Sequence, residues 1–130
     1  MTTDATTRIF HVCDRAAAQR AKAEGEYRPA SLAAEGFIHL SQGHQVQAVI
    51  QAFYAGVPDL VVLVVDPARL AAPLRYEAAA FMPGFAQGGK APAAGAFPHL
   101  YGPLEADAVL EIVDARRFDA HAIGRVAGPD

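Results

Sequence analysis

The sequence lacks tryptophan and holds a single cysteine, Cys13, in 130 residues. One thiol cannot form an internal disulfide, so we expect Cys13 to be a small buried side chain in a reducing cytoplasm. At this length the chain is expected to be one domain, residues 1–130, that buries roughly two-thirds of its unfolded surface. Aromatic residues make up only 8% of the chain, whereas hydrophobic residues make up 52% and are rich in alanine. The composition therefore predicts a tightly packed core of small side chains.

Runs of one charge and long apolar runs are also absent. The net charge is −3, and the 11 lysines and arginines are scattered, so no basic patch indicates a nucleic-acid partner. No apolar run approaches the roughly twenty residues that cross a bilayer, and no basic segment precedes an apolar one at the N-terminus. We therefore expect a soluble, cytoplasmic protein with no membrane partner. Because Gly-x-Gly-x-x-Gly and Gly-Lys-Ser/Thr are missing, Rossmann and P-loop sites are excluded.

The first half of the chain predicts two helices. Asp14 can accept a backbone N–H at the start of the alanine-rich run 15–24, and Gly25 provides a left-handed cap at its end. Ser41 is placed to cap the second helix, whose apolar residues recur at the spacing of one buried face. These apolar residues are Val46, Val49, Ile50 and Phe53.

Strands are expected between and after these helices. Leu60–Val65 is an unbroken apolar run between two aspartates, which is typical of a strand covered on both faces. Prolines near both ends of the segment 97–104 favour a strand at the edge of a sheet or the rim of a barrel. The remaining predicted strands cover 8–12, 37–40, 74–77 and 107–116. This order predicts an α+β fold with a mixed, largely antiparallel sheet and a core over about 8–116.

Two segments predict little regular structure. Residues 79–96 hold four glycines and two prolines with almost no charge, which indicates a flexible loop that could serve as a lid over a pocket. The segment 118–130 is expected to be a polar C-terminal tail.

Three histidines, His11, His39 and His99, lie on predicted strands and are the candidate catalytic residues. An imidazole with a pKa of about 6.5 can act as acid, base or hydrogen-bond donor at neutral pH. Three imidazoles could also hold a zinc ion. Because no His-x-His or His-x-x-x-His pair is present, we predict no metal site, and we expect His44 and His121 to face solvent.

Six further side chains are candidates for ligand binding. Arg28, which the following proline holds extended, could bind a phosphate or carboxylate, or it could pair with Glu26 or Glu35. Glu77 could orient a histidine or bind a ribose hydroxyl, or lie at a solvated strand edge. The other four candidates are Tyr27, Ser31, Ser41 and Tyr101.

Four segments of the sequence resemble the bacterial family called domain of unknown function 952. They are Gly25-Glu26-Tyr27-Arg28 with Ser31-Leu32, the run Glu35-Gly36-Phe37-Ile38-His39-Leu40-Ser41, Tyr76-Glu77, and Phe97-Pro98-His99-Leu100-Tyr101-Gly102. The resemblance covers residues 8–115. It implies an ADP-ribosyltransferase-like fold, a split-sheet α+β architecture that binds NAD in a cleft.

Within that fold the chain is similar to the branch of the RNA 2′-phosphotransferases. By position, His11 would hydrogen-bond the adenosine-side ribose, and His39 would lie beside the nicotinamide-side ribose and the phosphates. Many members carry a catalytic glutamate at the position that falls near residues 101–104, where this strand has no acid, so protein ADP-ribosylation is not expected. Relatives often have glutamate at the position of His44, so the capping box that starts at Ser41 is expected to be incomplete.

The resemblance thus implies a small nucleotide-like ligand, with NAD as substrate and ribosyl transfer or hydrolysis as the reaction. An alternative is a non-catalytic module that senses a small ligand or docks a protein. A metal-dependent hydrolase is a third reading.

Overall fold

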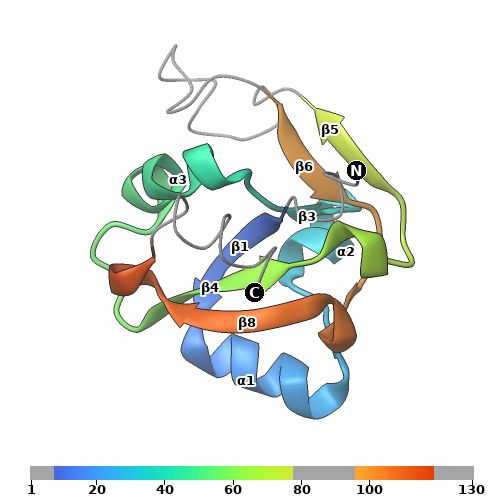
Figure 1. Ribbon diagram of the computed structural model, residues 1–130, viewed down its shortest axis with the longest axis horizontal. Helices are drawn as coiled ribbons and strands as arrows, with labels where there is room; N and C mark the ends of the chain where they lie inside the picture. Colours follow the sequence, from blue (N-terminus) through green and yellow to red (C-terminus); the bar gives the residue numbers. More distant parts are fainter. Residues whose placement is uncertain (1–7, 78–95, 119–130) are drawn as a thin grey trace, which may run out of the picture.

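The computed structural model describes residues 8–77 and 96–118. The predicted loop 79–96, apart from Ala96, lies outside the described residues, as do 119–130 of the predicted tail, including His121. The described chain is an α+β fold in which every strand pair is antiparallel (Figure 1). None of its helices is long and apolar enough to cross a membrane.

Three small sheets and three α-helices make up the described part. The strands are β1 (Ile9–Asp14), β2 (Glu26–Tyr27), β3 (Ile38–His39), β4 (Leu60–Val65), β5 (Leu74–Glu77), β6 (Phe97–Leu100), β7 (Leu104–Glu105) and β8 (Val109–Asp114). The helices are α1 (Arg15–Glu24), α2 (Ala30–Glu35) and α3 (Val46–Phe53). The sheets have the strand orders β1-β4-β8, β3-β6-β5 and β2-β7.

The prediction of a central buried strand at Leu60–Val65 is confirmed. β4 lies between β1 and β8, and all six of its residues are buried. Its alternate side chains reach opposite faces of the sheet, which explains the unbroken apolar run.

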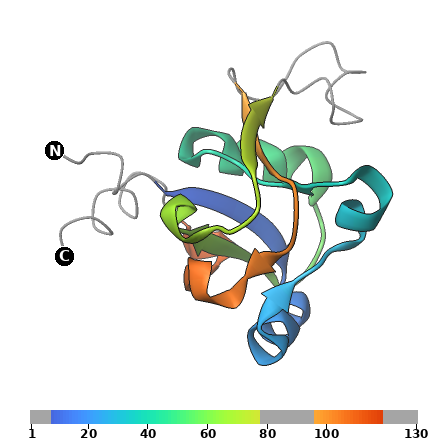
Figure 2. The same ribbon diagram turned by 90° about the vertical axis from the view of Figure 1, so that its right-hand side faces the viewer.

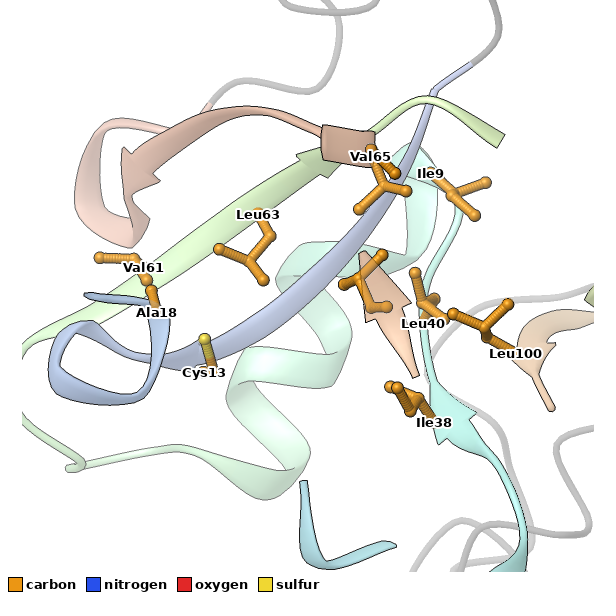
Figure 3. Close-up of a cluster of buried hydrophobic side chains, with 11 residues drawn as sticks. Ile9, Cys13, Ala18, Ile38, Leu40, Val61, Leu63, Val65 and Leu100 are labelled. Carbon is orange, nitrogen blue, oxygen red and sulfur yellow. The ribbon is translucent and has the colours of Figure 1, made fainter. Parts of the chain in front are cut away.

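Two apolar clusters cover the two faces of this sheet. On one face, one cluster extends from Ala18 of α1 across Cys13 and Leu63 of the sheet to Ile38 of β3 (Figure 3). On the other face, Val46 of α3 packs with side chains of β1 and β4. The small alanine of α1 lets that helix approach the sheet closely, as the alanine-rich composition predicts.

In the sheet β3-β6-β5, the strand β6 does not occupy the edge position that was predicted for it. Instead, β6 is the central strand, and its residue Pro98 lies opposite Tyr76 of β5. The backbone carbonyl of Pro98 accepts a hydrogen bond from Leu40 N at 2.9 Å. The proline is tolerated because the neighbour on that side, β3, is only two residues long and needs few ladder bonds. Figure 2 shows β5 and β6 side by side, leading away from the β1-β4-β8 sheet.

The helices confirm some predicted boundaries and correct others. Asp14 Oδ1 accepts the Ala17 N–H at 2.9 Å, and Gly25 closes α1 at φ 91°, so this helix has its predicted bounds. Both predicted helices are present as α1 and α3, and the structure adds the six-residue helix α2 between them. Ser41 caps no helix. Gln42 instead caps the 3₁₀ turn Gly43–Gln45 that leads into α3, and the Gln42 backbone N–H donates to Gln45 Oε1 at 2.8 Å.

The last predicted strand, 107–116, is shorter than expected. Ala106–Ala108 and Ala115–Arg117 form 3₁₀ turns at either side of β8. The second turn begins where Asp114 Oδ1 accepts the Arg116 N–H at 2.9 Å, a side-chain cap that competes with strand pairing.

Candidate functional site

A cavity of about 750 Å³ lies along the open edge of β1. β1 is an outer strand of its sheet, and its first half is covered by Ser41, which exchanges two backbone hydrogen bonds with Phe10 at 2.7 and 2.8 Å. Beyond this bridge the strand borders the cavity from Val12 to Asp14. Strand alternation turns the backbone N–H and C=O of Val12 toward the same side as those of Phe10.

Two chemically different walls enclose this cavity. The polar wall comes from β1, α2 and β3, and the apolar wall comes from α3 and the segment that leads to β4. The polar wall holds His11, Tyr27, Ser31, Glu35, His39 and Ser41, and the apolar wall holds Val49, Phe53, Tyr54, Val57 and Leu60. Five of the nine site residues predicted from the sequence therefore meet at one place: His11, Tyr27, Ser31, His39 and Ser41.

His11 is held by a hydrogen bond at each ring nitrogen. Nδ1 donates to the backbone carbonyl of His39 at 2.7 Å, because a carbonyl can only accept. In the neutral ring, Nε2 is then the acceptor, and the Tyr27 hydroxyl donates to it at 2.9 Å. Burial lowers the pKa of His11 to about 4, partly opposed by the bond to the carbonyl, and the nearby His39 lowers it further. His11 is therefore a neutral, fixed imidazole at pH 7.

The thiol and phenol beside His11 are also protonated at neutral pH. Burial, with a smaller effect of Asp14, raises the pKa of the Cys13 thiol to about 12. Burial also raises the pKa of Tyr27 well above its ordinary value. Cys13 is buried and is not activated as a nucleophile, in agreement with the expectation from the sequence.

His39 is oriented by a carboxylate. Its Nε2–H donates to Glu35 Oε1 at 2.5 Å, four residues back at the end of α2. The other nitrogen, Nδ1, is buried and has no hydrogen-bond partner among the residues that the structure describes. Glu35 and His39 thus form a carboxylate–imidazole pair on the cavity wall, an arrangement suited to moving a proton.

The structure places Arg28 outside this group. Its Nε pairs with Glu26, the salt bridge that was one of the two alternatives for this residue, and Arg28 does not line the cavity. Its side chain is 61% exposed. Arg28 is therefore a surface residue beside the site, already paired with an acid.

His99, which is buried, forms a separate cluster with the partly exposed Glu77 and Tyr101, here called the His99 cluster. Glu77 Oε1 accepts from His99 Nδ1 at 2.7 Å and from the Tyr101 hydroxyl at 2.6 Å. The Tyr101 and His99 hydrogen bonds lower the pKa of Glu77, and burial lowers the pKa of His99. A bond to a histidine was one of the alternatives given for Glu77, and none of the three residues is in the cavity lining.

Ring contacts join the two groups. His39 and His99 are directly opposite in the β3–β6 register, and their rings meet edge to face with centroids 5.3 Å apart. Phe37 contacts both rings, at 4.8 Å from His39 and 4.3 Å from His99. The His99 cluster therefore supports the position of the His39 imidazole and lies one ring away from the cavity.

Two features of the site were not predicted from the sequence. Glu35 was considered only as a partner of Arg28, although its spacing of four residues from His39 was a usable signal. Phe53 was assigned to a helix face and Tyr54 was not considered, and only the tertiary structure brings these two aromatic side chains to the cavity. Among the described residues, no group of three His, Cys, Asp or Glu side chains could hold a metal ion.

Comparisons with known proteins give a family and a fold. The sequence model of the family "Protein of unknown function (DUF952)" matches residues 12–112. The crystal structure of protein CC0527 from Caulobacter crescentus has a TM-score of 0.67 at 35% identity, covering 83% of this chain and 85% of that one. The solution NMR structure of the same protein gives 0.63 at 34% identity, covering 82% and 83%. No curated protein matches the chain.

Proposed function

Since the chain belongs to the DUF952 family of unknown function, we propose from the geometry of its cavity that it binds the ribosyl part of NAD or of a related nucleotide. The proposed reaction is transfer or hydrolysis at the nicotinamide-bearing ribose. We also propose that the fold is ADP-ribosyltransferase-like. The observation that carries the proposal is the meeting of His11, Tyr27 and His39 on one wall of a cavity of about 750 Å³.

The size and lining of the cavity favour a nucleoside-like ligand. Pockets for small molecules have volumes of roughly 300–1,000 Å³ and are mostly apolar with a few fixed polar groups. Phe53 and Tyr54 offer faces for an aromatic ring, and the opposite wall offers hydroxyls and an imidazole. The outward-facing N–H and C=O of Val12 are a donor and an acceptor with the spacing that a carboxamide needs.

The polar wall suits a ribose. The hydroxyls of Ser31 and Ser41 and the carboxylate of Glu35 are side-chain groups that can exchange hydrogen bonds with sugar hydroxyls. The neutral His11 and its partner Tyr27 hold the wall rigid, because each ring nitrogen of His11 is already bonded. A rigid wall reduces the entropy lost when a ligand is positioned.

The proposed chemistry begins with cleavage of the bond between ribose C1′ and the pyridinium nitrogen. The electron pair of this bond goes to the ring nitrogen, neutral nicotinamide leaves, and positive charge develops on the ribose as an oxocarbenium ion. Glu35 supplies a carboxylate beside that charge. Water, or the hydroxyl of an acceptor, then bonds to C1′ and loses a proton to the Glu35 carboxylate, which His39 Nε2–H holds in place.

Two measurements test this proposal together. The thermal unfolding temperature is recorded with and without NAD and ADP-ribose, and nicotinamide released from NAD is measured by chromatography. Ligand at about 100 times its dissociation constant adds about 2.7 kcal/mol to the free energy of unfolding. His39→Ala should abolish nicotinamide release, whereas His44→Ala, outside the described lining, should leave it unchanged. No thermal shift and no release with the wild type would refute the proposal.

A second candidate is a ligand-sensing module without turnover. It is favoured by the hydrogen bonds that occupy both ring nitrogens of His11, which leave this imidazole no free nitrogen for proton transfer. The same variant separates the two candidates. In an enzyme, His39→Ala lowers turnover and leaves much of the affinity, whereas in a sensor it lowers affinity and there is no turnover to lose.

A further inference from the structure

Apart from histidines, two charged side chains line the cavity, and both are acidic. They are Asp14 and Glu35, and no lysine or arginine is among the described residues of the lining. His11 adds no charge at pH 7, because burial lowers its pKa to about 4. The carboxylates make the potential in the cavity negative, which opposes a pyrophosphate and attracts a cation.

The nearest arginines are already paired with acids. Arg28 pairs with Glu26 and is mostly exposed to solvent. Arg15 pairs with Asp59 at 2.9 Å and with Asp114 at 3.2 Å. The positive charge of each arginine is therefore already balanced by a carboxylate, and neither arginine is in the cavity lining.

Aromatic rings accompany the two carboxylates. Tyr27, Phe53 and Tyr54 all line the cavity, and Phe53 is 38% exposed. The face of an aromatic ring attracts an organic cation, and the attraction is strongest where water is partly excluded. Carboxylates combined with aromatic faces are the side chains by which proteins recognise positively charged rings and ammonium groups.

Resting on the proposed ribosyl cleft, we infer that the cavity selects a cationic ring and that its ligand class is the pyridinium riboside, with no requirement for phosphates. The riboside places its positive ring against the aromatic wall and its sugar against Ser31, Ser41 and His39. The same carboxylate that attracts the ring, Glu35, then faces the ribose when the positive charge passes to it during cleavage. Any phosphates would extend away from Asp14 and Glu35.

Calorimetric titration with four probes tests the inference on the wild-type protein. Nicotinamide riboside is the cationic probe, and its reduced dihydro form is a neutral ligand of nearly the same shape. NAD and ADP-ribose are the phosphorylated probes with and without the cationic ring. We expect nicotinamide riboside to bind about tenfold tighter than its reduced form and at least as tightly as NAD, with ADP-ribose the weakest.

A pair of matched variants locates the effect. Glu35→Gln keeps the shape of the side chain and removes its charge, so the preference for the cationic over the reduced riboside should fall severalfold. Glu24→Gln removes one exposed carboxylate of α1 outside the described lining and should leave the preference unchanged. This comparison uses a ratio of affinities within each variant, so a general loss of stability would not produce the expected result.

The possible outcomes distinguish the inference from the function on which it rests. Equal binding of the two ribosides, or tighter binding of ADP-ribose than of nicotinamide riboside, would overturn the inference and leave the proposed ribosyl cleft in place. Binding by none of the four probes would overturn both. A preference for the cation that is unchanged in Glu35→Gln would also overturn the inference, because the charge would then act elsewhere.

Discussion

At the scale of single residues, the site depends on imidazoles whose hydrogen bonds define their state. Burial keeps His11 neutral by lowering its pKa, and the carbonyl of His39 and the hydroxyl of Tyr27 select its tautomer. Carboxylates hold the other two, since Glu35 accepts from His39 and Glu77 accepts from His99. These bonds have measurable consequences for stability and pH dependence.

The first prediction concerns pH and His11. Its pKa is about 4 in the folded protein and about 6.5 in the unfolded chain, so its contribution to stability is present above pH 6.5 and is lost as pH falls toward 4. Between pH 7 and pH 5 this residue alone should lower the free energy of unfolding by about 2 kcal/mol. The lowered pKa of His99 acts in the same direction. Urea denaturation at the two pH values measures the change.

The variant His11→Gln provides the comparison. Glutamine can donate to the carbonyl and accept from Tyr27, but it does not titrate. Its stability should therefore change by about 2 kcal/mol less over the same pH interval. An equal pH dependence in the variant and the wild type would show that His11 is not the titrating group.

The second prediction concerns the His99 cluster. Tyr101→Phe removes one of two hydrogen bonds to the Glu77 carboxylate and should lower the denaturation midpoint, because the carboxylate loses a donor. Tyr76→Phe is the matched control, since Tyr76 is 48% exposed on the same sheet and should change little. Equal denaturation midpoints for Tyr101→Phe and the wild type would contradict the role given to this hydroxyl.

At the scale of elements, some features of the fold follow from local sequence signals and others depend on tertiary contacts. The bounds of α1 were predictable because Asp14 and Gly25 act within a few residues of the helix they cap. The central position of β6 was not predictable, because it depends on the shortness of β3, far away in the sequence. Gln42 replaced Ser41 as a cap because Ser41 is held in a backbone bridge with Phe10, a contact that no local pattern reveals.

The third prediction concerns the turn between β6 and β7. A Cβ atom at Gly102 would lie 2.6 Å from Ala72 Cβ, so Gly102→Ala forces two chain segments apart. We expect a loss of about 1–3 kcal/mol of stability, as for other overpacked sites. The double variant Gly102→Ala with Ala72→Gly removes the clash and should recover most of the loss in the same denaturation experiment. Failure of the second substitution to restore stability would refute this close approach.

At the scale of the whole molecule, β4 joins the two apolar clusters. Leu63 is 1% exposed and lies in the centre of the sheet, so Leu63→Ala should lower stability by about 2–5 kcal/mol. Leu110→Ala is the control, because Leu110 is 39% exposed on β8 and should lose less than about 1 kcal/mol. Similar losses for the two variants in guanidinium denaturation would contradict the central position of β4.

The candidate site could be predicted from the sequence only in part, for a reason that belongs to the whole molecule. Strand patterns identified His11, His39 and His99 as polar residues on short strands. That His11 and His39 line the cavity while His99 lies in the His99 cluster depends on how two sheets meet. The aromatic wall comes from α3 and the residue after it, about 40 residues from β1 along the chain. Only the packed fold shows that Glu35, and not Arg28, lies at the cavity.

The most direct test of the central claim is an NMR titration of ¹⁵N-labelled protein with NAD. The account predicts saturable shifts of backbone amides that concentrate on Val12, on the segment from Ser31 to Ser41 and on the end of α3, the elements around the cavity. His39→Ala should leave these shifts largely in place, because this substitution is expected to lower turnover more than affinity. Shifts confined to other surfaces, or none at millimolar NAD, would contradict the claim that this cavity is the ligand site.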